Sequence, residues 1–439
     1  MIEALRRRAA APIDGASSFV LRVALGLLLV VGVIRQFAFG WVDSFYVAPR
    51  FHFTYWGFSF IRAWAEPWMS LHLVALGLAA LALAVGFRHR LAAVTAFLLF
   101  TYFELIDEST YLNHYYLVSI VLALMAFMPL SRGWSVDARG RGEEQIPRLC
   151  LWVLRLQFGL VYFFAGVAKL KADWLFEAQP LSIWLSANAD APLVGPLLRE
   201  PWVAFFASWF GAIFDLTLPF ALLWKRTRPY AFVAALLFHL VTAYLFKLGM
   251  FPWIMMAGAT LFFEPDWPRR ALRLGERLPR PRPDLTTIPG WMWLGLGAHF
   301  LVQLALPLRH HLYAGNMCWT EQGFRFAWHV MLVEKGGLVR YRVHDAASNR
   351  EWLVYPRDYL APHQQKAMAT QPDMILQLAH HIARDYTTRL GAPVEVRADA
   401  FVAFNGRRSQ RLIDPDVDLT TVEDGLAPKP WILPLRSEL

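Results

Sequence analysis

Nine apolar segments fill most of the first two thirds of the chain and limit its fold more than any other feature of the sequence. They occupy residues 18–40, 70–87, 91–106, 115–131, 149–169, 203–224, 229–246, 248–263 and 290–308. A helix needs about 20 mainly apolar residues to cross a bilayer, and these segments are close to that length. The 439 residues are 56% hydrophobic and only 18% charged, whereas soluble domains average about 25% charged residues. We therefore predict a multi-pass α-helical membrane protein with about nine transmembrane helices.

The connections between these segments differ in their content of Lys and Arg. One alternate set carries most of them, namely Arg6, Arg7, Arg8, Arg88, Arg90, Arg132, Arg139, Arg141, Arg148, Lys225, Arg226, Arg228 and the arginines between residues 269 and 282. The other set carries Arg50, Arg62, Lys169, Lys171, Arg199 and Lys247. Because Lys and Arg are retained in cytoplasmic loops, we expect the N-terminus in the cytoplasm and the chain after the ninth segment on the opposite side. The net charge of +9 is thus a topology signal, and nucleic acid is not expected as a partner.

Residues 310–439 contain no long apolar segment and are predicted to form an extramembrane α+β domain on the non-cytoplasmic side. The patterns are strand-like alternation at 338–355, a helical pattern at 363–390, and two strand-like runs around an Asn405-Gly406 turn. Residues 270–289 are basic and proline-rich, and we interpret them as a cytoplasmic linker. The expected organisation is a transmembrane helical bundle at 1–309, which holds the catalytic site, followed by the second domain.

The segment QFGLVYFFAGVAKLKADW, residues 157–174, combines an apolar helix with a stripe of small and polar residues. At about 100° per residue, Arg155, Gly159, Tyr162, Gly166 and Lys169 fall near one line. A buried amine is costly to keep charged, so Lys169 could act as a free base near neutrality. The alternative is that Lys169 extends to the membrane interface while the glycines pack helices closely. For Lys171 we favour that interfacial role.

Three further ionisable side chains interrupt apolar segments or lie at their ends. His114 follows Asn113 on the same outer side as Lys169, and is either an interfacial histidine or a group that binds an oxygen anion. Asp215 lies near the middle of its segment, and we expect a structural ion pair with Arg155. His239 is similarly deep, and both a structural pair and an active-site role remain open.

Common catalytic and metal-binding signatures are absent from the sequence. There is no HExxH, Walker loop, GxSxG or GxGxxG motif, and no metal is predicted. The two cysteines, Cys150 and Cys318, are too few for a disulfide framework, and the topology places them on opposite sides of the membrane.

Several segments resemble the vitamin K-dependent γ-glutamyl carboxylases in the same order along the chain. They are NHYYL at 113–117, QFGLVYFFAGVAKLKADW at 157–174, LGMFPW at 248–253, PDWPRR at 265–270, CWTEQGFRFAWHVML at 318–332 and QRLIDPDVDL at 410–419, together with FDL near 215 and FH at 238–239. The sequence departs from the family pattern at His329, where an acid is typical, and at Ala168, which replaces the first of two lysines.

The resemblance implies an enzyme that couples epoxidation of vitamin K hydroquinone to carboxylation of peptidyl glutamate, with O2 and CO2 as co-substrates. In that family a lysine deprotonates the hydroquinone, and oxygen addition then yields an alkoxide strong enough to remove the γ-proton of glutamate. The resemblance places this base on Lys169 and the assisting histidine on His114. It also implies substrate-binding roles for Asn113, Tyr162 and His239, and for Trp328 and Met331 in the glutamyl-substrate region.

The expected partners are therefore a glutamate-containing peptide or protein, a quinol and the lipid bilayer. The location is the inner cell membrane of a prokaryote, or the endoplasmic reticulum membrane of a eukaryote. Two alternatives stay open: a quinol epoxidase without peptide carboxylation, and a non-enzymatic membrane protein that binds or transports a quinone or lipid. A transporter would be expected to show inverted repeats, and no pairing of halves stands out.

Overall fold

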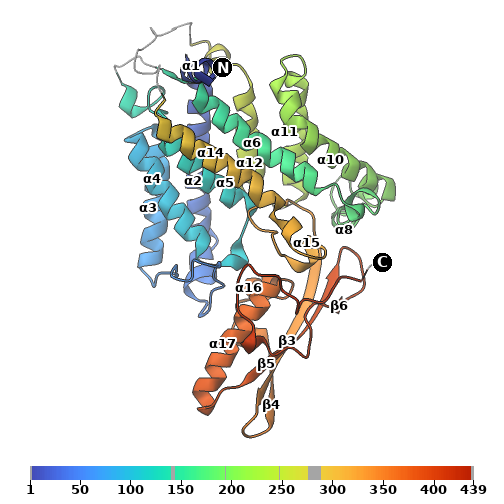
Figure 1. Cartoon of the computed structure of the whole chain (residues 1–439). Coiled ribbons are helices and arrows are strands. Elements are labelled where there is room, and N and C mark those ends of the chain that lie inside the picture. Colours follow the sequence, from blue (N-terminus) through green and yellow to red (C-terminus); the bar gives the residue numbers. More distant parts are fainter. Residues whose placement is uncertain (1, 140–143, 193, 247, 275–287, 437–439) are drawn as a thin grey trace.

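The computed structural model describes residues 2–139, 144–192, 194–246, 248–274 and 288–436. A bundle of helices forms one part of the molecule, and a small sheet with two helices lies at one end of that bundle (Figure 1). The N-terminus lies at the opposite end of the bundle from the sheet (Figure 1).

Each of the nine apolar ranges overlaps a helix of the structure. These helices are α2 (Ala16–Ala38), α3 (Trp68–Val85), α4 (His89–Leu105), α5 (Asn113–Ala126), α6 (Arg148–Ala168), α10 (Pro201–Leu223), α11 (Arg228–Leu245), α12 (Phe251–Ala259) and α14 (Gly290–Leu308). In the described part of the chain, six helices are long and apolar enough to cross a membrane. The chain is therefore a membrane protein, while the count of nine spans stays a prediction. The 14 residues of α5 extend only about 21 Å, which is short of the about 30 Å of a bilayer core.

Shorter elements complete the bundle and its loops. They are α1 (Ile2–Ala10), α7 (Ala172–Leu175), α8 (Leu181–Ala187), α9 (Gly195–Leu198), α13 (Trp267–Ala271) and α15 (Met317–Thr320), with β1 (Pro12–Asp14) paired antiparallel to β2 (Gln145–Pro147). The predicted linker lies largely outside the described residues. Large apolar side chains such as Phe206, Leu237 and Leu301 are exposed on the outer surface of the bundle, as expected for contact with lipid.

The C-terminal sheet is antiparallel with the strand order β4-β3-β5-β6. Its strands are β3 (Lys335–Asp345), β4 (Arg350–Val354), β5 (Glu395–Phe404) and β6 (Gln410–Arg411), and its helices are α16 (Pro362–Met368) and α17 (Pro372–Leu390). Alternate side chains on β3 and β5, such as Val343 and Val396, are buried, as the alternating pattern predicts. Helix α17 packs on that face, where the buried Tyr341 hydroxyl donates to the carbonyl of Ile375 at 3.0 Å.

Two details of this region differ from the sequence prediction. The helical pattern at 363–390 is interrupted between Met368 and Pro372, because proline cannot donate the backbone hydrogen bond that a continuous helix requires and is tolerated in a first helical turn. The Asn405-Gly406 turn is present, with φ of 45° and 82°. The returning strand β6 is short, however, and begins only at Gln410, so the connection is longer than a two-residue hairpin turn.

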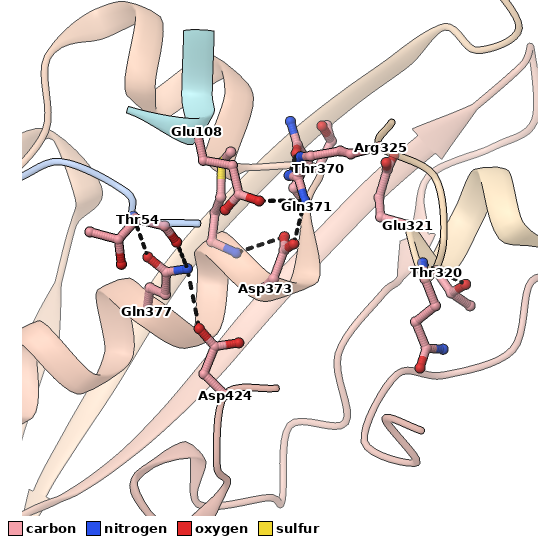
Figure 2. Close-up of polar contacts among 12 residues, drawn as sticks. Thr54, Glu108, Thr320, Glu321, Arg325, Thr370, Gln371, Asp373, Gln377 and Asp424 are labelled. Carbon is pink, nitrogen blue, oxygen red and sulfur yellow. Dashed lines mark hydrogen bonds and ion pairs between the residues drawn. The ribbon is translucent and has the colours of Figure 1, made fainter. Parts of the chain in front are cut away.

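A buried ion network joins the C-terminal region to the bundle (Figure 2). Arg325 Nη1 lies 2.8 Å from Glu108 Oε1, in the loop between α4 and α5, and 2.6 Å from Asp373 Oδ2 at the start of α17. Burial opposes ionisation of Asp373, yet the Arg325 guanidinium brings the pKa of this carboxyl down to about 2. Nearby, Gln377 bonds reciprocally to the backbone of Thr54, with distances of 3.0 and 2.9 Å. These contacts fix the orientation of the sheet and its helices relative to the bundle.

Candidate functional site

The close approach of α6 and α10 positions the lysine that the sequence singles out. A Cβ atom added to Gly166 would lie 2.6 Å from the backbone nitrogen of Leu216, so only glycine allows this spacing. Gly159, two turns earlier on the same stripe, faces Pro219 of α10. Close helix packing, which we expected together with an interfacial Lys169, is thus present at Gly166, but there it brings Lys169 next to the buried Asp215.

Lys169 forms a buried ion pair with Asp215. Its Nζ lies 2.7 Å from Asp215 Oδ2, and the two side chains are only 6% and 7% exposed. The same amine donates to the carbonyl of Ala165 at 3.2 Å and lies 5.3 Å from the centroid of the Trp174 ring. The Lys169 amine therefore points back into the bundle, and its hydrogen bond to Asp215 is shielded from water.

The expected Arg155–Asp215 pair is wrong. Arg155 donates from Nε to the carbonyl of Leu261 at 2.7 Å and from Nη2 to the carbonyl of Phe263 at 2.8 Å. Arg155 lies near the start of α6 and Lys169 directly follows its end, so the two basic groups of one stripe are separated by most of the helix. Asp215 lies beside the end of α6 that Lys169 follows, so it pairs with Lys169 and not with Arg155.

Tyr162 and His239 form a second buried pair beside the first. The Tyr162 hydroxyl and Nε2 of His239 share a hydrogen bond of 2.7 Å, while Nδ1 of His239 has no partner among the described residues. Tyr162 also lies within electrostatic range of Asp215. The His239 ring is 6.0 Å from the ring of Phe251, which faces the main cavity of the bundle.

This main cavity has a volume of about 890 Å³ and lies between α2, α3, α4, the start of α5 and residues 248–253. Most of its lining is apolar. Its polar lining residues include Asn113 and His114 at the start of α5, and Met331 of the C-terminal region also lines it. Lys169 and Asp215 are not part of its lining.

His114 presents its imidazole to this cavity. The side chain is buried, with its ring 6.0 Å from the ring of Phe251, and it forms no hydrogen bond to the residues that the structure describes. Aromatic and imidazole rings thus form a row from His114 through Phe251 and His239 to Tyr162. This row connects the cavity with the surroundings of the Lys169–Asp215 pair.

The segment 326–331 brings the C-terminal region to the cavity. Asn113 Nδ2 donates to the carbonyl of His329 at 3.0 Å, and the fully buried Trp328 ring stacks on Tyr116 with centroids 5.0 Å apart. Phe326, Trp328 and Met331 all adopt positive φ, between 55° and 60°. Such left-handed backbone is costly for these side chains and persists only where the surroundings enforce it. Met331 joins Asn113 and His114 at one cavity, whereas Trp328 supports the segment from behind.

Sequence reasoning missed three parts of this arrangement. Arg35 and Gln36 line the cavity from the end of α2, and Gln36 Oε1 is buried without a partner among the described atoms. The sequence signal for these two residues was the polar pair Arg35-Gln36 within the apolar range 18–40. The third is His329, which is only 4% exposed and has no partner for either ring nitrogen in the part of the chain that the structure describes. Burial and the nearby cations Lys171, Arg309 and Lys169 lower the pKa of His329 to about 3.

We expect His329 to make the protein less stable in mild acid. The unfolded histidine titrates near pH 6.5 and the folded one near 3, so below pH 6.5 the unfolded chain takes up a proton that the folded chain does not. Between pH 7.5 and 5.0 this lowers the free energy of unfolding by about 2 kcal/mol. Unfolding of detergent-solubilised protein at the two pH values measures the loss. His329→Gln should remove this part of the pH dependence, and an unchanged pH dependence in that variant would contradict the assignment.

Lys171 differs from Lys169 in its surroundings. Its Nζ donates to Cys318 Sγ at 3.3 Å, and the side chain is half-buried beside a small cavity of about 350 Å³. Both cysteines are free and buried. Among the described residues, no group of three or more His, Cys, Asp or Glu side chains is arranged to hold a metal.

Comparisons with known proteins cover almost all of the chain. The family model for the HTTM domain matches residues 10–267. The model for the vitamin K-dependent gamma-carboxylase lumenal domain matches residues 289–438. No solved structure gives a significant match. The two matches divide between the helical bundle and the region that contains the sheet.

Proposed function

Because the chain belongs to the vitamin K-dependent γ-carboxylase family, we propose that it couples epoxidation of a reduced quinone of the vitamin K type to γ-carboxylation of peptidyl glutamate. The observation that carries the proposal is the cavity that His114 and Asn113 of the bundle line together with Met331 of the lumenal-domain match. In this cavity, an apolar site for a lipid-soluble reductant would be continuous with a second site. A peptide can approach that second site from outside the bilayer.

The cavity fits an isoprenoid quinol in volume and chemistry. Its volume of about 890 Å³ and apolar walls suit a hydrocarbon chain. The unpartnered Gln36 Oε1 can accept a hydrogen bond from a quinol hydroxyl, and the imidazole of His114 can bind a second oxygen. When bound, the quinol supplies the reducing power for the reaction with O2 that generates a base strong enough to remove a γ-proton of glutamate.

Lys169 is proposed as the final acceptor of the proton that the quinol releases. Movement of one proton along the 2.7 Å bond to Asp215 converts the ion pair into a neutral amine and a carboxylic acid. Burial reduces the cost of this conversion, because two separate charges are poorly solvated there. Tyr162 and His239 lie between the cavity wall and this pair, and they could carry the proton by hydrogen-bond exchange. His114 then stabilises the negative oxygen that remains.

The proposed orientation places the N-terminus in the cytoplasm and the sheet region outside it. The distribution of Lys and Arg supports this orientation, and so does the word lumenal in the description of the matching domain. His114 lies in the first turn of α5, Met331 precedes β3 of the sheet by only a few residues, and both line the main cavity. A secreted or exported glutamate-containing peptide could therefore approach them.

The test supplies purified protein with vitamin K hydroquinone, O2, bicarbonate and a glutamate-containing peptide, and quantifies epoxide and carboxylated peptide separately. Both products are expected. Epoxide alone would indicate an epoxidase without carboxylation, and neither product would favour a protein that only binds or transports a quinone or lipid.

We expect His114→Ala to lower epoxide formation about a hundredfold, because it removes the proposed stabiliser of the oxygen anion. The side chain has no hydrogen bond to break among the described residues, so the thermal midpoint should change little. His72→Ala is the matched control, since His72 of α3 does not line this cavity and the variant should retain most activity. Equal loss in both variants would contradict a specific role of His114.

A further inference from the structure

A second cavity lies on the other side of the α4–α5 pair from the proposed quinol site. Its volume is about 520 Å³, and α4, α5, α6 and α14 enclose it. Among the residues that the structure describes, none lines both cavities. Phe100 and Phe103 of α4 face the first, while Phe97, Thr101 and Glu104 of the same helix face the second.

Glu104 leaves one carboxyl oxygen without a partner in this cavity. Thr101 Oγ1 donates to Ser119 Oγ at 3.1 Å, and Ser119 Oγ donates to Glu104 Oε2 at 2.9 Å. The other oxygen, Oε1, is buried and has no partner among the described residues, and the whole side chain is only 4% exposed. A buried carboxyl oxygen without a hydrogen bond is costly, so this atom needs a ligand that can donate to it.

Tyr116 supplies the complementary group. Its hydroxyl oxygen accepts from Gln303 Nε2 at 2.8 Å, and Gln303 in turn accepts from Gln157 Nε2 at 3.2 Å. The hydroxyl hydrogen of Tyr116 remains available, because the tyrosine donates to no other described residue. His299 is fixed at the same cavity by a 2.9 Å hydrogen bond to Gln157 Oε1.

The rest of the lining is apolar and reaches the lipid-facing helix α14. Only 11% of the apolar window of that helix is buried, so it covers the cavity without close packing. Gly295 lines the cavity, and a Cβ atom added there would meet no atom within 4 Å. The space beside α14 can therefore admit a hydrocarbon chain from the bilayer.

We propose that this cavity binds a membrane-soluble long-chain alcohol, with its hydroxyl between Glu104 and Tyr116. A hydroxyl can donate to Glu104 Oε1 and at the same time accept from Tyr116. An ammonium head could not accept from Tyr116, and a phosphate or carboxylate head would find no Lys or Arg among the lining residues to pair with its charge. A plain acyl chain would leave both polar groups unsatisfied.

Photolabelling tests this site in the full chain reconstituted in nanodiscs. The probe is a diazirine analogue of the C20 isoprenoid alcohol phytol, and cross-links are mapped by mass spectrometry. We expect labelling of α4, α5 and α14. Unlabelled phytol should compete about tenfold better than the hydrocarbon phytane, a difference that corresponds to about 1.4 kcal/mol of binding free energy. Equal competition by phytane would mean that any acyl chain fills the cavity, and would overturn the proposal.

Two glycines of α14 provide a matched pair of variants. Gly295→Leu fills the cavity and should abolish labelling, whereas Gly297→Leu adds the same side chain outside the lining and should leave it unchanged. Labelling that survives Gly295→Leu would also overturn the proposal. In Glu104→Leu, phytol should compete for labelling less than about twofold better than phytane, because the hydroxyl loses its acceptor. If Glu104→Leu does not fold, the two glycine variants still test the proposal.

Discussion

Lys169→Ala is expected to lower epoxide formation at least about a hundredfold, because a positioned base contributes about 10² to 10⁴ in rate. The reason is the position of its amine, which lies 2.7 Å from Asp215 Oδ2 and is shielded from water. The measurement is the rate of epoxide formation from vitamin K hydroquinone under O2. Lys171→Ala is the matched control and should retain most of the activity, because Lys171 contacts Cys318 instead of a buried carboxylate.

Loss of folding has to be separated from loss of chemistry in this experiment. Lys169→Ala leaves Asp215 buried without its counter-charge, which costs about 3–5 kcal/mol of stability for a typical buried pair. The double variant Lys169→Met/Asp215→Leu removes both charges, so its thermal midpoint should recover while epoxide formation stays absent. Epoxide at the wild-type rate in this double variant would show that the pair is structural and that the base lies elsewhere.

Arg325→Met is expected to lower the free energy of unfolding by about 3–5 kcal/mol, since it removes the guanidinium that directly contacts the carboxyl groups of Glu108 and Asp373. The Arg325 side chain is only 9% exposed, so water cannot replace it. Unfolding of the solubilised protein, followed by tryptophan fluorescence, measures the effect.

Arg340→Met is the matched control for this second prediction. Arg340 also pairs with an aspartate, Asp399, at 3.2 Å, but its side chain is 53% exposed. An exposed pair of this kind contributes about 0–1 kcal/mol. If the two variants lose the same stability, the network at Arg325 does not hold the sheet region on the bundle as described.

Much of the fold could be predicted from the sequence, because periodicity depends on local composition. Each of the nine apolar ranges overlaps a helix, and the alternation at 338–355 corresponds to β3 and β4. The predicted helix at 363–390 was too long, since the effect of Pro372 on the preceding hydrogen bonds was overlooked. The number of spans could not be settled in this way, because α5 and α12 are shorter than a bilayer is thick.

The candidate site was harder to predict, since it depends on contacts between distant segments. The stripe ending at Lys169 identified the helix face, and Gly166 explains why that face touches α10. We expected Arg155 as the partner of Asp215. The sequence gives the order of residues along α6, but it does not show which turn of α6 lies opposite Asp215 of α10. Arg35 and His329 were missed as site residues for the same reason, because only packing shows that Arg35 lines the cavity and that His329 is buried next to the lining residue Val330.

The hydrogen bond from the Asn113 side chain to the backbone carbonyl of His329 has a consequence for the ancestry of the protein. The two residues fall in different domain matches, and so do His114 and Met331, which line one cavity. Neither domain encloses this chamber without the other. If one domain were replaced by that of a distant relative, segment 326–331 and the start of α5 would no longer match, and the chamber would stay open. These two segments are therefore expected to have co-evolved.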